Sequence, residues 1–210
     1  MAADLISLMK TQRACRAFLS EPVSDATIGR VLDAAVHAPS AENSQPWEFI
    51  VVRDAERRAR IGDLMARAWQ AHGRDHSRDR LSAALFTDVD VGLSGGIAAA
   101  PVLIVVAVDR RRCHAANPGS SIFPAVQNLL LAAAALGLGS ALTTIATVYG
   151  DELRFLVGLP AALEPVAVIP LGVPTRKLGP PRREPFARHT HREGYGQPWE
   201  GSTLKPDLPD

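Results

Sequence analysis

The strongest constraint on this sequence is a segment without any charged residue at 122–148. Pro124, Gln127 and Asn128 interrupt its apolar run, so it lacks the unbroken stretch of about 18 apolar residues that indicates a membrane-spanning helix. A helix that is apolar on all sides can instead be buried inside a protein. We therefore expect a helix that ends near Gly137 and lies in the core of the domain or in a subunit interface.

The length and composition predict one globular domain spanning residues 1–210. Hydrophobic residues make up 47% of the 210 positions, as in ordinary folded proteins. The formal net charge of +1 is weaker than a nucleic-acid or anionic-membrane partner normally requires. Cys15 and Cys113 are too few for a disulfide framework, and the N-terminus does not resemble a secretory signal. We therefore expect a cytoplasmic protein with neither nucleic acid nor a membrane as partner.

Residue periodicity predicts helices and strands in irregular alternation. Apolar residues at helical spacing predict a helix between Ser24 and Pro39 and another that Asp54 caps. Shorter helices are expected at 4–10 and 151–158, and short β-rich runs predict strands at 47–52, 102–108 and 165–171. This pattern is typical of an α+β or α/β fold.

Three further features of the chain bear on the fold. Residues 72–91 are rich in His, Arg, Asp and Ser, and we expect a mobile loop or lid there, in part helical. Pro170 predicts that the last strand is an edge strand or ends at that point. Half of the sixteen prolines follow residue 169, so residues from about 175 to 210 are expected to form an extended arm over the surface or around a partner subunit.

Several common cofactor and metal motifs are absent from the sequence, including GxxxxGK[ST], HExxH and CxxC. Gly137 and Gly139 follow a helix and not a strand, which does not fit a dinucleotide-binding fingerprint. His72 and His76 have helical i, i+4 spacing but no evident third ligand. We therefore predict solvated histidines and no metal site.

Polar residues gather in separate segments that could bind a ligand. Arg13 and Arg16 are spaced so that both could reach one anion, although two solvated arginines are the simpler interpretation. Residues 38–47 offer Ser, Asn and Gln side chains between two prolines, which suits a heterocycle and an ordinary polar turn about equally well. The segment 139–144 has small residues that would let a flat ring approach the backbone, and 182–185 adds late arginines.

The order and the residues of these segments resemble those of the FMN-dependent nitroreductase family over nearly the whole chain. The family's Arg-Arg-Ser-x-Arg-x-Phe stretch is matched at 12–18, and its most specific motif, Ala-Pro-Ser-x-x-Asn-x-Gln-Pro-Trp, is matched very closely at 38–47. The resemblance continues with an apolar helix and Gly-Leu-Gly at 136–140, Leu-Gly-x-Pro at 171–174, and an Arg-rich Pro segment at 182–185.

The resemblance implies an α+β fold with a central mixed, mainly antiparallel sheet, and a homodimer with exchanged terminal arms and FMN at its interface. Arg13, Arg16 and Arg183 would contact the phosphate of FMN. Ser40 and Asn43 would contact its ribityl chain and ring, and the main chain at Thr143 or Thr144 would lie beside the reactive N5 edge. The full set of implied cofactor-binding residues is Gln12, Arg13, Ala14, Arg16, Ser40, Asn43, Leu142, Thr143, Thr144, Arg182 and Arg183.

Two departures from the family pattern concern the phosphate of FMN. Gln12 stands where the first family arginine is expected, and Ala14 stands where the serine is expected. One charge and one hydroxyl are therefore missing, for which Arg182 or main-chain N–H groups could compensate.

The implied activity is electron transfer from NADH or NADPH to a nitroaromatic, a quinone or another flat electron-poor acceptor, with no catalytic side chain. The alternatives are a specialised FMN enzyme of the same fold, such as a dehalogenase or a flavin-fragmenting enzyme, a non-catalytic flavin-binding protein, and a structural dimer without flavin.

Overall fold

A four-stranded antiparallel sheet forms the centre of the molecule. The computed structural model describes residues 4–113 and 117–199. Strands β1 (Trp47–Val52), β2 (Val102–Asp109), β3 (Gly139–Ser140) and β4 (Leu163–Gly172) lie in the order β1-β2-β4-β3. Each neighbouring pair is antiparallel. The α+β fold is confirmed. The expected mixed sheet is wrong for these four strands, because none of the three pairs is parallel.

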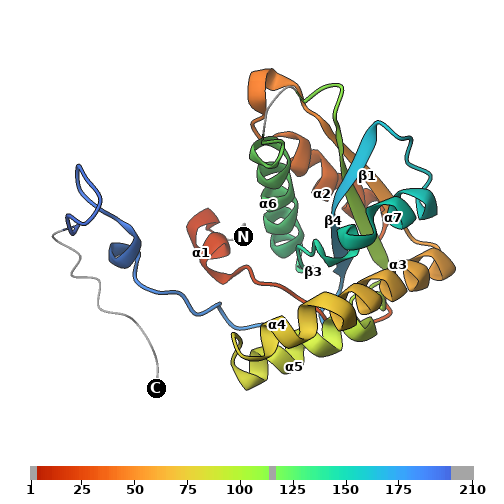
Figure 1. Cartoon of the computed structure of the whole chain (residues 1–210), viewed down its shortest axis with the longest axis horizontal. Helices are drawn as coiled ribbons and strands as arrows, with labels where there is room; N and C mark the ends of the chain where they lie inside the picture. The colour runs from red at the N-terminus through yellow and green to blue at the C-terminus, as the bar shows by residue number, and fades with distance from the viewer. Residues whose placement is uncertain (1–3, 114–116, 200–210) are drawn as a thin grey trace.

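Two hydrophobic clusters cover the two faces of the sheet. Alternate residues of β2 point to opposite faces, so Ile104 packs in the cluster with helices α2 (Asp25–Val36) and α6 (Gly119–Ala135). Its neighbour Leu103 packs in the other cluster with α3 (Ala55–Ala68) and α7 (Gly150–Leu156). Figure 1 shows α2 and α6 on one side of the sheet and α3 and α7 on the other. The sheet is therefore a central layer between two helical layers.

Three of the predicted helix starts are confirmed by side-chain caps. Helix α1 (Leu5–Thr11) begins after Asp4, whose carboxylate accepts from the N–H of Ser7 at 3.2 Å. Ser24 and Asp54 cap α2 and α3 in the same way. These oxygens satisfy N–H groups that have no partner inside the helix.

The first part of the uncharged segment forms most of α6, which is buried on the side that faces the sheet and exposed at Phe123 and Gln127. Ala125, Leu129 and Ala133 are fully buried on the side that faces the sheet. The helix ends at Ala135, and Gly137 follows with a φ of 76°, a left-handed conformation that glycine adopts easily after a helix. None of the helices in the described residues is long and apolar enough to cross a membrane.

The region expected to be a loop or lid is mostly helical. It contains a π-helical turn at Trp69–Gly73, then α4 (Arg74–Arg78), α5 (Ala83–Val91) and a second π-helical turn at Gly92–Gly96. Asp90 accepts hydrogen bonds from the Trp69 indole N–H at 2.7 Å and from the Arg74 guanidinium at 2.9 Å. These contacts fasten α5 to the preceding helices. Helix α5 has no buried residue, which explains why the sequence showed no apolar period there.

Strand β4 lies between β2 and β3, so the expectation that Pro170 marks an edge strand is wrong. Pro170 stands opposite Leu103 of β2, and β3 pairs only with Leu171 and Gly172. The alternative expectation, that Pro170 marks the end of the strand, agrees with a strand that ends at Gly172.

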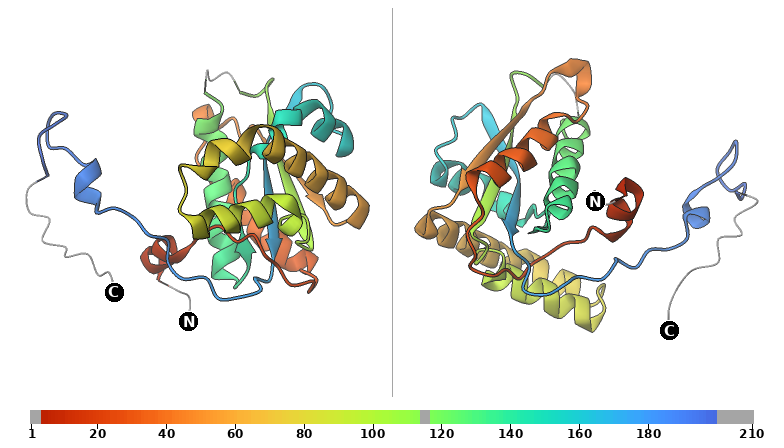
Figure 2. Two further views of the ribbon diagram at one scale, coloured as in Figure 1. Left: turned by 60° about the horizontal axis from the view of Figure 1, so that its bottom comes forward. Right: turned by 180° about the vertical axis from the view of Figure 1, so that it is seen from behind.

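The chain beyond β4 leaves the compact body. Figures 1 and 2 show it running away from the sheet past α1 to a short 3-10 turn at Phe186–His189. Its first residues remain attached, because the N–H of Thr175 donates to the carbonyl of Ala17 at 3.2 Å. The described part of the expected arm is therefore extended, and residues 200–210 lie outside the described residues.

Asp109 at the end of β2 should make stability depend on pH. The Arg111 guanidinium donates to both carboxylate oxygens of Asp109, at 3.0 and 2.8 Å, and holds the pKa of that carboxyl at about 2, below its usual 3.8. A lowered folded-state pKa stabilises the protein above the unfolded-state pKa, and that contribution is lost as the pH falls through the folded-state value. We therefore expect Asp109→Asn to unfold at lower urea concentration than the wild type at pH 7.

The difference in the urea concentration of unfolding between Asp109→Asn and the wild type should disappear between pH 4 and pH 2. Urea unfolding at pH 7, 4, 3 and 2 measures it. Asp151→Asn is the control, because that carboxylate is 94% exposed in its ion pair with Arg154 and should change stability little. A gap of equal size at pH 7 and pH 2 would contradict the prediction.

Candidate functional site

The N-terminal arginine segment is bound to the end of the sheet. The N–H of Cys15 donates to the carbonyl of Ser140 at 2.9 Å, and the N–H of Leu19 donates to the carbonyl of Val173 at 2.8 Å. Gly139 lies so close that an added Cβ would be 2.6 Å from the Cys15 sulfur. Burial raises the pKa of the Cys15 thiol, which agrees with a packing residue and not with a nucleophile.

The same anchoring holds two predicted arginines beside one small pocket of about 20 Å³. Arg13 donates to the carbonyl of Gly179 at 3.4 Å, and Arg16 donates to Asp88 at 2.7 Å. Arg176, from the start of the C-terminal arm, lines the same pocket. Ala14 also lines it. The structure therefore places three arginines around one pocket.

Two predicted phosphate ligands lie elsewhere in the chain. Arg182 and Arg183 are exposed on the arm, where Arg183 donates to the carbonyl of Arg182 at 2.9 Å. Gln12 caps the end of α1 through its backbone and does not line the pocket. Sequence reasoning missed Arg176 and Asp88. Arg176 could have been found from its position two residues after the matched Leu-Gly-x-Pro stretch. Nothing in the sequence indicated Asp88.

The loop before β1 holds a backbone conformation that is rare for residues other than glycine. Glu42, Asn43 and Gln45 have φ values of 54°, 54° and 47°, in the left-handed region that L-residues seldom adopt. The Ser40 hydroxyl accepts from the N–H of Gln45 at 3.0 Å, and the buried Ser121 hydroxyl of α6 accepts from the N–H of Ala41 at 3.0 Å. Such local strain persists only where the surroundings impose it, and it is common at binding sites.

The segment after β3 offers one main-chain donor. Thr143 and Val168 exchange two backbone hydrogen bonds, so the N–H of Thr143 is already used at 3.1 Å. The N–H of Thr144 has no acceptor among the described residues. Thr144 is exposed and lines a hollow of about 650 Å³ together with Phe123 and Thr147. Leu142 beside it is 43% exposed. Of the two predicted candidates, Thr144 is therefore the one with an available donor.

The predicted site residues lie at opposite ends of the sheet. Trp47, directly after the Ser40 loop, stands opposite Val108 of β2. Val102, at the other end of β2, stands opposite Leu171, close to the arginine pocket. Val108 lies six positions after Val102 along the strand, which corresponds to roughly 20 Å. One chain therefore does not bring Ser40 and Asn43 to Arg13 and Arg16.

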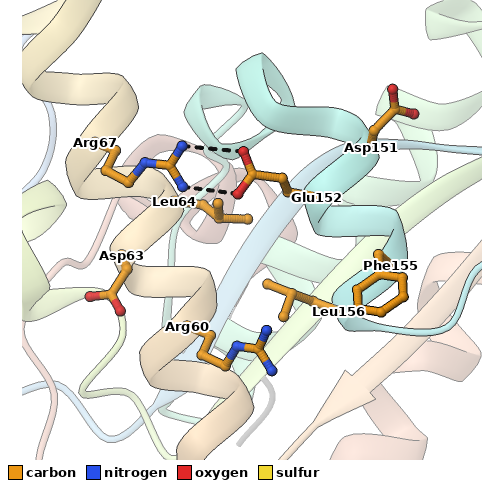
Figure 3. Close-up of a pocket in the computed structure, with 8 residues that line it drawn as sticks. All are labelled: Arg60, Asp63, Leu64, Arg67, Asp151, Glu152, Phe155 and Leu156. Atoms are coloured by element: carbon orange, nitrogen blue, oxygen red, sulfur yellow. Dashed lines mark hydrogen bonds and ion pairs between the residues drawn. The ribbon is translucent and has the colours of Figure 1, made fainter.

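The hollow between α3 and α7 is separate from all of these residues (Figure 3). Its volume is about 510 Å³. Arg67 and Glu152 form a bidentate ion pair across it, in which Nη1 and Nη2 of Arg67 donate to the two carboxylate oxygens of Glu152 at 2.9 and 3.2 Å. Phe155, at its rim, is 82% exposed. Because none of the residues that the sequence motifs indicate lines this hollow, we do not assign the site to it.

Comparison with known proteins identifies the family. The family model described as "Nitroreductase family" matches residues 9–173, so the chain belongs to the nitroreductase family of oxidoreductases. An NADH dehydrogenase/NAD(P)H nitroreductase of Methanothermobacter thermautotrophicus is 32% identical over 181 residues, covering 84% of this chain and 80% of the relative.

Two further relatives show how the family varies. A nitroreductase from Desulfovibrio desulfuricans, solved in complex with FMN, superposes with a TM-score of 0.70 at 28% identity, covering 93% of this chain and 99% of that one. The 5,6-dimethylbenzimidazole synthase of Rhodospirillum rubrum is 32% identical over 150 residues, covering 64% of this chain and 66% of the relative. Relatives at the same identity thus have different named activities, so membership of the family does not fix the substrate.

Ser121 should be essential for the shape of the Ser40 loop. Ser121→Ala removes the acceptor for the N–H of Ala41 at a fully buried position. Ala41 is itself exposed, so its N–H can bind water instead, and we expect the free energy of unfolding to fall by about 0.5–1.5 kcal/mol, as for an ordinary hydrogen bond. Urea unfolding measures it. Ser120→Ala is the matched control, because Ser120 is exposed and donates only to Asn117. Equal effects of the two substitutions would contradict the assignment.

Proposed function

We propose that this protein is an FMN-dependent NAD(P)H oxidoreductase that reduces flat, electron-poor acceptors such as nitroaromatics or quinones. The observation that carries the proposal is the pocket in which Arg13, Arg16 and Arg176 converge. Family membership supports it, as do the FMN in the Desulfovibrio relative and the NAD(P)H nitroreductase name of the Methanothermobacter relative.

The donors that are present have the chemistry that binds the phosphate group of FMN. The free space of about 20 Å³ between them is room for little more than one water, so the phosphate would lie against these side chains and not be enclosed by them. Guanidinium groups match phosphate geometry and bind it through charge-assisted hydrogen bonds. Within the described residues, the hydrogen bonds of Arg16 use Nη1 alone, so its Nε and Nη2 have no recorded partner. Arg13 and Arg16 would hold the phosphate, and the N–H of Thr144 would donate to the ring. Bound FMN supplies hydride chemistry between the nicotinamide and the acceptor.

The chain's own contribution is binding and orientation. The backbone donor at Thr144 can stabilise negative charge without a proton transfer from a side chain. The hollow beside Thr144 is open and is lined by Phe123 and by two ion pairs, Arg110 with Glu164 and Arg154 with Asp151. Reductant and acceptor would enter there in turn.

We further propose that the working protein is a homodimer with exchanged terminal arms. The Ser40 loop and the arginine pocket lie at opposite ends of one sheet, so a second chain would complete each site. Apolar side chains are exposed on α1 and on the arm, which suits a surface that a partner covers. They are Leu5, Ile6 and Met9 on α1, and Phe186, Tyr195 and Trp199 on the arm. The arm would carry Arg182 and Arg183 to the partner's phosphate site.

The visible absorption spectrum tests the proposed activity. We expect the purified protein, reconstituted with FMN, to show a bound flavin spectrum that NADH or NADPH bleaches under anaerobic conditions. A quinone or nitroaromatic should then restore it. A bound flavin that neither nicotinamide bleaches would contradict the oxidoreductase activity, and a protein that takes up no FMN would contradict the cofactor assignment.

Arg13→Gln provides the site-specific part of this test. Loss of a charged hydrogen-bond donor should weaken FMN binding about tenfold or more. Arg60→Gln removes an arginine from the hollow between α3 and α7 and should leave FMN binding unchanged.

Multi-angle light scattering tests the dimer. The chain has a mass of 22.4 kDa, and we expect a particle of about twice that mass across the micromolar range. Deleting the residues after Leu178 should shift the population towards single chains and weaken FMN binding, because the arm and its arginines are lost. A full-length protein with the mass of one chain would contradict the proposal.

A further inference from the structure

We propose that Asp88 of α5 is a positioning residue that orients Arg16 towards bound FMN. The proposal rests on the function proposed above and adds a role for the segment 83–96. It starts from the ion pair between Arg16 Nη1 and Asp88 Oδ2 at 2.7 Å. The two side chains are 21% and 35% exposed, so the pair is shielded from water more than an ordinary surface pair. It joins the N-terminal arginine segment to a helix that is distant in sequence.

The stem of Arg16 fits a space that two glycines leave open. An added Cβ at Gly92 would lie 2.7 Å from Arg16 Cδ and 2.8 Å from its Cβ. An added Cβ at Gly96 would lie 2.7 Å from the carbonyl oxygen of Arg16. Real Cβ atoms do not approach so closely, so any side chain at either position would displace Arg16.

The ion pair and the glycines form one surface for Arg16. Asp88 and Gly92 are four residues apart at the end of α5, which places them close to one face of that helix. Gly96 follows a non-helical residue, Gly95, with a φ of 141°, and its own close approach to Arg16 brings it to the same side chain. Gly92 therefore packs against the aliphatic part of the Arg16 side chain, Gly96 packs against the Arg16 backbone, and Asp88 pairs with the guanidinium group. This surface fixes the position of the guanidinium before any ligand binds.

The ion pair leaves Arg16 able to bind an anion. Asp88 engages Nη1 only, and Nε and Nη2 have no recorded partner in the described residues. Asp88 Oδ1 also lies 3.9 Å from Arg176 Nη2. With Arg13, the charged residues that line the pocket are three arginines and one aspartate, so its lining remains positive by two charges. The carboxylate thus spaces and aligns the arginines without cancelling their attraction for a phosphate.

FMN titration of Asp88→Asn tests the proposal. Quenching of flavin fluorescence on addition of apoprotein gives the Kd for FMN. We expect Asp88→Asn to raise that Kd about tenfold or more, and Asp88→Glu to recover part of the loss. The control is Asp79→Asn at the end of α4, because Asp79 is exposed and Arg16 pairs with Asp88 and not with it. Its Kd should equal that of the wild type.

Gly92→Ala tests the same geometry while keeping both charges. Its added Cβ would displace the stem of Arg16, and alanine favours a helix more than glycine does, so this variant should fold and bind FMN more weakly. If Asp88→Asn and Gly92→Ala both bind FMN as the wild type does, or bind it more tightly, the inference is wrong. If the wild type itself binds no FMN, the proposed function is wrong, and the inference, which rests on it, is wrong as well.

Discussion

The burial of strand β2 on both faces is the constraint on which the rest of the structure depends. All eight of its residues are buried. An apolar strand of this kind must lie inside a sheet with a helical layer on each face, since either face left open would expose a row of Val, Ile and Leu to water. Strands β1 and β4 therefore flank it, and the uncharged α6 belongs to one of the two covering layers.

Because the interior of the sheet is filled with apolar side chains, polar groups are concentrated at its ends. One end holds the strained Ser40 loop, where the N–H of Asp109 donates to the carbonyl of Pro46 at 2.7 Å. The other end holds the arginine segment, bound by backbone hydrogen bonds to Ser140 and Val173. The length of β2 separates the two groups within one chain.

Much of this arrangement could be predicted from the sequence. The caps at Asp4, Ser24 and Asp54 depend on local hydrogen bonds, the apolar periods of α2 and α3 indicate their buried faces, and the uncharged run indicates α6, so all of these could be predicted from the sequence. Helix α5 could not be predicted in this way, because none of its residues is fully buried and its apolar contacts, from Phe86 and Val89, are only partly buried. The antiparallel direction of every strand pair and the internal position of Pro170 depend on tertiary pairing, which no local pattern reports.

The candidate site shows the same division between local and tertiary information. The residue types at Arg13, Arg16, Ser40 and Asn43 were evident from their motifs. The partners of those residues were not, because Asp88 and Arg176 come from distant parts of the chain.

This distant origin also bears on the missing family arginine at Gln12. The expected compensation by Arg182 is not seen within one chain, where Arg182 is exposed on the arm. Instead, the pairing of Ala17 with Thr175 brings Arg176 into the pocket. A guanidinium from the start of the C-terminal arm thereby supplies the positive charge that the N-terminal motif lacks. The charge of the pocket is thus set by the pairing of two chain segments more than 150 residues apart, and neither segment alone would reveal it.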